Sequence, residues 1–189
     1  MSDLLTLSDV ACWRGGRLLF EGLSVRLGRG EGLWVRGPNA TGKSSLLRIA
    51  AGLLKPLAGT VAGSAVALAD EALALDRELT LLRALRLWAA LDDSEQLRAA
   101  LAALDLSHLA DVPVRLLSTG QARRARLARV LAAGTPVWLL DEPLNGLDDA
   151  SMQAVAAAIA DHRAAGGAVL LASHLPIPTG DWRTLELAA

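Results

Sequence analysis

The residues best suited to chemistry form the stretch Gly37-Pro38-Asn39-Ala40-Thr41-Gly42-Lys43-Ser44, which fits the phosphate-binding pattern G-x-x-x-x-G-K-[S/T]. Small residues let backbone N–H groups face phosphate oxygens, and a helix expected over 44–50 presents its positive end to them. Lys43 is expected to reach the β- and γ-phosphates of ATP, and the Ser44 hydroxyl to bind Mg²⁺. A glycine-rich turn without a ligand is the alternative, but the strand expected before the loop and the helix after it argue against that.

Two adjacent acids follow an apolar run later in the chain. The run 137–140 is typical of a buried strand, and Asp141 and Glu142 follow it at the end where open α/β sheets bind ligands. Asp141 is expected to hold Mg²⁺ through its water shell, and Glu142 to orient and deprotonate an attacking water. Strands that end in solvated acids are common, so the catalytic interpretation depends on the phosphate-binding loop upstream.

The elements that would position these residues fall into three groups. Alternating apolar residues predict strands at the start of the chain, and Gly15-Gly16 predicts a turn between two of them. The middle, from Thr80 to about Ala133, is predicted to be helical, and the end has the strand-helix-strand order of a parallel sheet. The predicted strands are 5–10, 23–27, 32–36, 60–68, 136–141 and 168–173, and the last helix is 149–165. The expected helix caps in the middle are Thr80, Asp92 or Asp93, and Ser118 or Thr119.

Composition favours a soluble cytoplasmic domain. The 189 residues are enough to bury a core, and no apolar stretch reaches the roughly 18 residues that a membrane-spanning helix needs. The N-terminal residues lack the pattern of a signal peptide, and the single cysteine, Cys12, is expected to be a small apolar core residue. With 19 Lys and Arg against 20 Asp and Glu, the chain has no excess of positive charge for nucleic acid.

A third motif points to a family. Leu117-Ser118-Thr119-Gly120-Gln121 precedes an arginine-rich helix and the acidic strand, and it resembles the signature of the ABC ATPases, usually L-S-G-G-Q. The resemblance covers about 5–174. It implies an α/β P-loop NTPase fold with a RecA-like core, an antiparallel β subdomain and an inserted α-helical subdomain at approximately 79–133. It also implies that residues 1–189 form a single nucleotide-binding domain.

The resemblance further implies a head-to-tail homodimer that encloses ATP. Ser118 and the Gly120 amide of one chain would contact the γ-phosphate bound by the other, and Asp148 would lie in a D-loop that crosses the interface. His174 would contact the γ-phosphate as the switch histidine. Trp13 would stack on adenine, although packing in the core is an alternative for it. The expected site residues are Lys43, Glu142 and His174 for catalysis, Trp13, Gly37, Pro38, Asn39, Ala40, Thr41, Gly42, Lys43, Ser44 and Ser45 for the nucleotide, Ser118, Thr119, Gly120 and Gln121 in trans, and Ser44 and Asp141 for the metal.

Three features depart from the family pattern. Ala40 and Thr119 stand where glycine is usual; the alanine costs little if its φ is negative, whereas the β-branched threonine is expected to slow catalysis. A glutamine that usually follows the strand at 60–68, where it touches Mg²⁺ and the attacking water, is missing. Glu71 or Asp70 is the candidate substitute, with Glu71 a further candidate metal ligand, and either one would put charge where the family has a neutral amide.

Within the ABC ATPases, three segments resemble the ATP-binding subunits of bacterial cytochrome c biogenesis and heme export, the CcmA family. They are 12–20, 79–91 and 172–176. This resemblance implies integral membrane subunits as partners and a peripheral position on the cytoplasmic side of the bacterial inner membrane.

Other classes fit less well. An ABC importer or exporter of another substrate is the main alternative. A soluble DNA-repair ABC ATPase would need a long coiled-coil insert, for which the roughly 70 residues between Lys43 and Leu117 are too few. A ribosome-acting ABC protein usually carries two cassettes, and a P-loop kinase would leave the signature and His174 unexplained.

Overall fold

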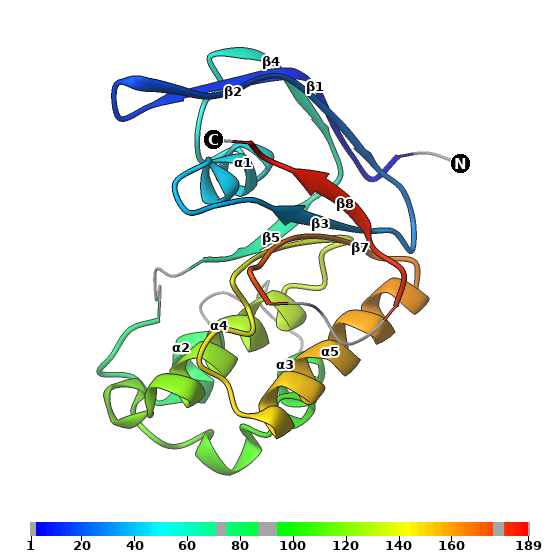
Figure 1. Cartoon of the computed structure of the whole chain (residues 1–189). Helices are drawn as coiled ribbons and strands as arrows, with labels where there is room; N and C mark the ends of the chain where they lie inside the picture. The colour runs from blue at the N-terminus through cyan, green and yellow to red at the C-terminus, as the bar shows by residue number, and fades with distance from the viewer. Residues whose placement is uncertain (1–2, 71–74, 87–93, 176–179, 189) are drawn as a thin grey trace.

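Two sheets and a group of helices make up the computed structural model, which describes residues 3–70, 75–86, 94–175 and 180–188 (Figure 1). In Figure 1 the antiparallel sheet lies at one end, the parallel sheet in the middle, and helices α2 to α5 at the other end. The elements are β1 (Leu5–Arg14), β2 (Arg17–Leu27), β3 (Gly32–Arg36), α1 (Lys43–Ala50), β4 (Ala58–Gly63), β5 (Val66–Ala69), α2 (Leu81–Arg86), α3 (Ser94–Ala103), the 3-10 helices η1 (Ser107–Leu109) and η2 (Val114–Leu116), α4 (Thr119–Ala132), β6 (Val137–Asp141), α5 (Asp149–Ala164), β7 (Ala168–Ala172) and β8 (Arg183–Glu186).

The parallel sheet brings distant segments to one edge. Its strand order is β5-β6-β7-β3-β8, and every neighbouring pair is parallel. Ala172 at the end of β7 pairs with Val35 of β3 and with Asp141 of β6. Because these three strands end level with one another, the loops that follow them leave the sheet side by side.

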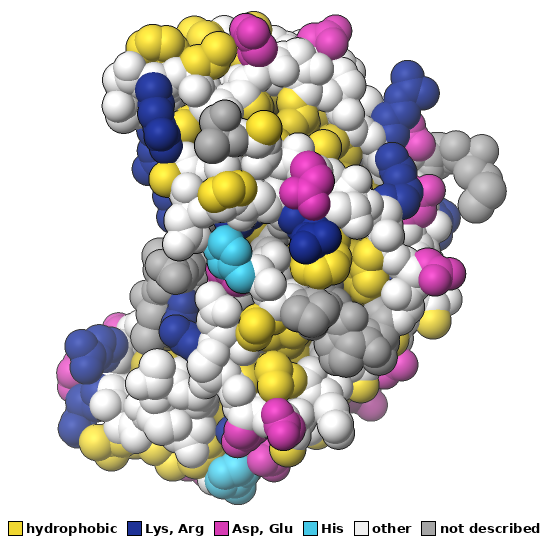
Figure 2. Space-filling model, viewed as in Figure 1, with side chains coloured by type: hydrophobic (Ala, Val, Ile, Leu, Met, Phe, Trp, Pro, Cys, Tyr) yellow, Lys and Arg dark blue, Asp and Glu magenta, His cyan; other side chains and the backbone are white. Residues whose placement is uncertain are grey.

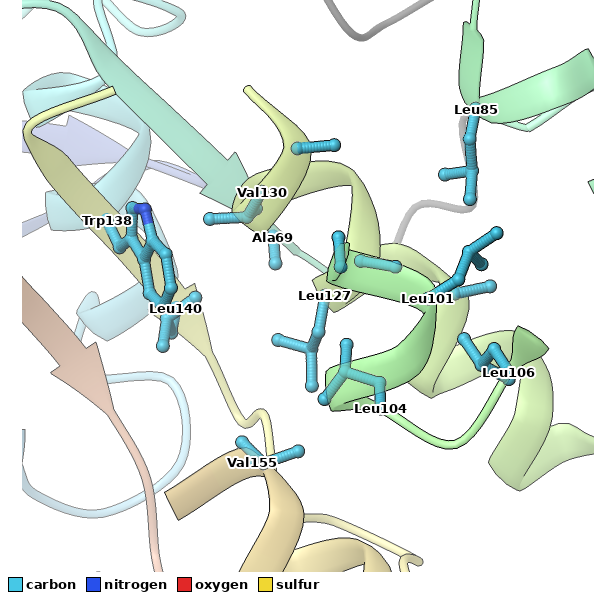
Figure 3. Close-up of a cluster of buried hydrophobic side chains, with 14 of the residues drawn as sticks. Ala69, Leu85, Leu101, Leu104, Leu106, Leu127, Val130, Trp138, Leu140 and Val155 are labelled. Carbon is cyan, nitrogen blue, oxygen red and sulfur yellow. The ribbon is translucent and has the colours of Figure 1, made fainter. Parts of the chain in front are cut away.

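Side chains alternate across this sheet and supply two hydrophobic cores. Trp138 and Leu140 of β6 belong to the core shared with α2 to α5, and Figure 3 shows them facing Leu127 of α4. Val137 and Leu139 belong to the core shared with α1 and the antiparallel sheet. Since burying one such apolar side chain contributes about 1.5–3 kcal/mol, apolar residues on both faces hold the sheet between its two covering layers.

The antiparallel sheet has the order β2-β1-β4 and lies over α1. The single strand predicted at 60–68 is wrong, because the chain there forms two strands in different sheets: β4 pairs with β1, and β5 pairs with β6. The break follows Gly63, whose φ is 150° and where a Cβ would lie 2.4 Å from the Leu4 carbonyl oxygen. That close approach allows only glycine, and after it the chain crosses to the second sheet.

The helical middle agrees with the sequence prediction in part. Ser118 caps α4, since its hydroxyl accepts from the Gln121 N–H while the Gln121 side chain accepts from the Ser118 N–H. Thr80 precedes α2 and also forms an isolated bridge with Pro113. The predicted cap at 92 or 93 lies outside the described residues. Strand β8, which pairs with β3 at the sheet edge, is not predicted from the sequence.

The face of the molecule seen in Figure 2 is chemically mixed. In Figure 2 basic side chains form separate groups among acidic and hydrophobic ones. Cys12 is buried, as predicted, and burial raises the pKa of its thiol. Within the described ranges, no helix combines the length and apolar character required to cross a bilayer.

One half-buried histidine, His162, is placed to make stability depend on pH. His162 of α5 stacks on Trp138 of β6, with ring centroids 3.8 Å apart and an interplanar angle of 8°. Burial lowers the pKa of His162, and hydrogen bonds with the backbone at Pro136 and Ala168 oppose the shift. Because the pKa is lower in the folded state than in the unfolded chain, protonation favours unfolding, and stability is lost as pH falls below the unfolded value of about 6.5.

We expect the free energy of unfolding to decrease between about pH 7 and about pH 5.5, and His162→Gln to flatten that decrease because the amide does not titrate. Urea unfolding at several pH values measures both slopes. His108→Gln, at an exposed position, controls for the loss of one histidine. An unchanged slope in His162→Gln would exclude His162 as the responsible group.

Candidate nucleotide-binding site

The loop between β3 and α1, residues 37–42, has a backbone that requires glycine at both ends. Gly37 has a φ of 140°, and a Cβ there would lie 2.3 Å from the Leu187 carbonyl oxygen. Gly42 has a φ of 106°, and a Cβ there would lie 3.0 Å from the Phe20 ring. Helix α1 begins at Lys43 without a side-chain cap, so its first N–H groups point into the loop and can donate to an anion.

Ala40 differs from the sequence expectation. Its φ is +65°, so the expectation of a low cost at negative φ does not hold. The left-handed conformation costs a residue with a Cβ about 1–2 kcal/mol. Arg17 donates to the Ala40 carbonyl oxygen, which holds the loop in this shape.

A pocket of about 420 Å³ opens over this loop. It brings together residues from the loop, from α1, from the end of β6, from the segment after β7 and from the β1–β2 hairpin. Its lining residues are Arg14, Gly15, Arg17, Leu19, Asn39, Ala40, Gly42, Lys43, Ser44, Ser45, Asp141, Glu142 and His174. Most of the residues predicted to contact the nucleotide or the metal within one chain therefore meet in one place.

Four of these residues form a polar network. The Lys43 ammonium donates to the carbonyl oxygens of Gly37 at 2.7 Å and Pro38 at 2.9 Å, and its Nζ lies 3.3 Å from His174 Nε2. The same His174 nitrogen lies 2.7 Å from Asn39 Oδ1 and 3.3 Å from Glu142 Oε1. His174 thus touches the loop, the lysine and the acid at once.

Glu142 is held by its backbone as well as by its side chain. Its φ is 48°, a left-handed conformation that is rare for a residue with a side chain. The Glu142 N–H donates to the Ala172 carbonyl oxygen at 2.8 Å, and the His174 N–H donates to Glu142 Oε2 at 3.2 Å. Strain of this kind persists where the surroundings over-determine the backbone, and it is concentrated at functional sites.

The signature segment lies at the start of α4 and does not line this pocket. Ser118 and Thr119 are exposed, and Gly120 and Gln121 are half-buried. Asp148, predicted for the D-loop, caps α5 by accepting from the Ser151 N–H at 2.8 Å. Hydrogen bonds from the Ser151 side chain and from its backbone N–H lower the pKa of Asp148.

Arginines of α4 connect the signature helix to the acidic strand and its neighbour. Arg123 donates to the Asn145 carbonyl oxygen in the turn after Glu142. Arg126 donates to the Asp70 carbonyl oxygen at 3.1 Å, and Arg129 donates to the carbonyl oxygen of Leu68 in β5. Their spacing of three residues, which puts them on one helix face, was the sequence signal for this connection.

Five positions predicted for contacts within one chain, all among the described residues, do not line the pocket: Gly37, Pro38 and Thr41 of the loop, Trp13 and Asp70. Trp13 is 57% exposed and does not line it, which also excludes the alternative that Trp13 packs in the core. The Asp70 carboxylate pairs with Arg48 at 3.2 Å instead of lining this pocket. Glu71 lies outside the described residues.

Three side chains of the pocket are not predicted from the sequence motifs. Arg14, Arg17 and Leu19 line it from the β1–β2 hairpin. The available signal was the two-residue Gly15-Gly16 turn, because a hairpin that short puts the flanking residues, Arg14 and Arg17, opposite each other on one face.

Comparison with known proteins agrees with this geometry. Residues 20–145 match the family model described as ABC transporter. A cytochrome c biogenesis ATP-binding export protein CcmA from Sphingopyxis alaskensis is 58% identical over 184 residues, which cover 96% of this chain and 95% of the relative. The chain belongs to the CcmA family of ABC transporter ATP-binding proteins. A second CcmA, from Novosphingobium aromaticivorans, is 52% identical over 97% of this chain and 95% of the relative.

Solved structures confirm the predicted fold of this CcmA-family chain. An ATP-binding subunit of an ABC transporter matches with a TM-score of 0.83 and 25% identity, over 91% of this chain and 80% of that one. An ABC transporter ATP-binding protein from Pyrococcus furiosus matches with a TM-score of 0.83 and 22% identity, over 97% and 96%. The predicted α/β P-loop NTPase fold of ABC type is therefore confirmed, and the chain is an ATPase of the ABC class.

We expect Ala40→Gly to raise the free energy of unfolding by about 0.5–1 kcal/mol, because glycine adopts the left-handed conformation without the Cβ penalty but is more flexible when unfolded. Urea unfolding without nucleotide measures the change. The matched control is Ala51→Gly at the end of α1, where φ is −79° and the substitution should destabilise. A loss of stability in Ala40→Gly would contradict the strain at this position.

Proposed function

We propose that this chain hydrolyses ATP as the nucleotide-binding subunit of a cytochrome c biogenesis and heme export complex, and thereby drives a membrane partner. The observation that carries the proposal is the meeting of Lys43, Asp141, Glu142 and His174 in one pocket. The proposal is also supported by sequence: the chain is 40–58% identical to proteins named cytochrome c biogenesis ATP-binding export protein.

In the proposed site, the triphosphate binds the loop 37–42 and the first turn of α1. The Lys43 ammonium now donates to two loop carbonyls, and in the complex it exchanges them for β- and γ-phosphate oxygens. The N–H groups of residues 39–45 donate to the phosphates from the positive end of the helix. Charge-assisted hydrogen bonds of this kind are about twice as strong as neutral ones, which favours the exchange.

The residues present fit Mg²⁺. The Ser44 hydroxyl and the Asp141 carboxylate both line the pocket, and both offer the oxygen ligands that Mg²⁺ prefers. No cluster of three or more His, Cys, Asp or Glu able to hold a metal occurs within the described ranges. That is typical of Mg²⁺ sites, which use one or two protein oxygens together with phosphate and water. Bound Mg²⁺ would neutralise charge on the β- and γ-phosphates.

Glu142 is proposed as the general base. Its carboxylate accepts from the His174 N–H, so it is oriented toward the γ-phosphate end of the pocket, where it can take a proton from water. The His174 ring, which lies between Asn39 and Glu142, is proposed to contact the γ-phosphate and to position Glu142.

We further propose that two copies of the nucleotide-binding domain, residues 1–189, pair head to tail. Ser118, Thr119, Gly120 and Gln121 lie apart from the pocket of their own chain, and two of them are exposed. In the pair, the Ser118 hydroxyl and the Gly120 amide would contact the γ-phosphate in the other chain, and Asp148 would lie at the interface. The helical region at about 79–133 and the segment of Glu71 would transmit closure to integral membrane subunits, with this chain bound peripherally at the cytoplasmic side of the bacterial inner membrane.

We expect Glu142→Gln to bind ATP but to reduce turnover at least about 100-fold, because an amide cannot accept the proton from water. A phosphate-release assay measures turnover, and light scattering with Mg-ATP detects the trapped dimer. Lys43→Ala should lose ATP binding itself, while Glu186→Gln, at an exposed ion pair with Arg36, controls for the loss of one carboxylate. Wild-type turnover in Glu142→Gln would refute the base, and a monomer at saturating ATP would refute the head-to-tail pair.

We expect tagged Glu142→Gln, pulled down with Mg-ATP from mildly solubilised membranes, to bring with it integral subunits of cytochrome c biogenesis. Mass spectrometry identifies them, and an unrelated tagged protein controls for non-specific capture. Recovery of a different permease would contradict heme export as the transport function, but it would leave the proposed ATPase cycle in place. Recovery of soluble proteins alone would contradict the transport assignment.

A further inference from the structure

The pocket has two ends, with the phosphate-binding loop between them. At one end, Asn39 of the loop and Lys43 of α1 contact His174, next to Glu142. At the other end, the loop contacts the β1–β2 hairpin, since Arg17 donates to the Ala40 carbonyl oxygen. If the γ-phosphate faces the acids, as proposed above, the base of the nucleotide must extend toward the hairpin.

The pairing of the hairpin separates its side chains into two sets. Trp13 pairs with Leu18, and Arg14 pairs with Arg17. Because cross-strand partners share a face and consecutive residues alternate, the two pairs point in opposite directions. Arg14 and Arg17 line the pocket, whereas Trp13 is 57% exposed, Leu18 is 41% exposed, and neither lines it.

Of the hairpin side chains that line the pocket, Arg14 is the one suited to a base. Arg17 is engaged by the Ala40 carbonyl oxygen, and Leu19 lies against Gly42. Leu19 is at an irregularity in the β1–β2 register, where the pairing shifts between Cys12 and Trp13. The Arg14 guanidinium is planar, and its Nη1 lies 3.4 Å from the hydroxyl of Ser45, a buried residue of α1. This contact holds the plane beside the first turn of α1.

We propose that Arg14 is the side chain that lies against the nucleotide base, and that Trp13 does not contact the nucleotide. The inference rests on the proposed binding of ATP in this pocket. A guanidinium stacks on an aromatic face through cation–π attraction and through contact of two planar groups. Every base has such a face, so stacking favours nucleotides over free polyphosphate but does not distinguish ATP from GTP.

Calorimetric titration of the full chain with Mg-ATP, Mg-GTP and Mg-tripolyphosphate tests the proposal. We expect Arg14→Ala to weaken ATP and GTP on the order of tenfold each and to leave tripolyphosphate unchanged, because the last has no base. Arg14→Trp should restore ATP affinity, since an indole is also a stacking plane, whereas Arg14→Lys should not. Trp13→Ala is the matched neighbour and should bind ATP like the wild type.

Each other outcome has a distinct meaning. Equal weakening of ATP and tripolyphosphate in Arg14→Ala, with rescue by Arg14→Lys, would overturn the proposal and make Arg14 a phosphate contact. Weakening in Trp13→Ala without weakening in Arg14→Ala would return the base to Trp13. Failure of the wild type to bind ATP or tripolyphosphate would refute the proposed nucleotide site itself. Thermal unfolding of each variant verifies that it is folded.

Discussion

The hydrogen bonding of β7 to both β3 and β6 is the constraint on which the site depends. The phosphate-binding loop follows β3, the acids follow β6 and His174 follows β7, so no two of these groups are close in sequence. Ala172 pairs with Val35 on one side and with Asp141 on the other, and its carbonyl oxygen accepts from the Glu142 N–H. A shift of one residue in either pairing would turn the buried side chains of that strand to the opposite face. Burial on both faces therefore fixes where the proposed catalytic groups meet.

The site stores conformational strain that this sheet supports. Ala40 and Glu142 both have positive φ angles, and each has a backbone group held by a hydrogen bond. Arg17 holds the Ala40 carbonyl, and Ala172 holds the Glu142 N–H. Folding free energy from the two hydrophobic cores offsets the strain, a pattern common where catalytic groups must be held in one orientation.

Helix α4, which begins with the signature segment, is hydrogen-bonded to the end of the parallel sheet where the acids lie. Arg123, Arg126 and Arg129 each donate to a backbone carbonyl in the turn after Glu142 or at the end of β5. Hydrogen bonds from charged donors typically contribute about 1.5–3 kcal/mol each. Three of them make α4, the end of β5 and the acidic turn one connected unit, although α4 packs in the helical core.

The sequence by itself determined the class of chemistry. Gly37, Gly42, Lys43 and Ser44 form a local pattern whose spacing is enough to predict phosphate binding, because backbone conformation and helix polarity act over a few residues. The strand before the acids could also be predicted from the sequence, since residues buried on both faces form an uninterrupted apolar run. The cap of α4 by Ser118 is another interaction within one turn.

Tertiary structure decided the features that depend on contacts between distant segments and on the direction in which a side chain points. Gly63 divides the predicted strand at 60–68 because of the Leu4 carbonyl, a contact no local pattern reveals. Ala40 has a positive φ and its carbonyl oxygen accepts from Arg17, a residue distant in sequence. Strand β8 forms by pairing with β3 at the edge of the parallel sheet. At the hairpin, a step of one residue separates Trp13, which faces outward, from Arg14, which faces the pocket. Neighbouring residues of a strand point to opposite faces, so approximate position in the sequence could not show whether Trp13 or Arg14 faces the pocket. The pairing across the Gly15-Gly16 turn shows it.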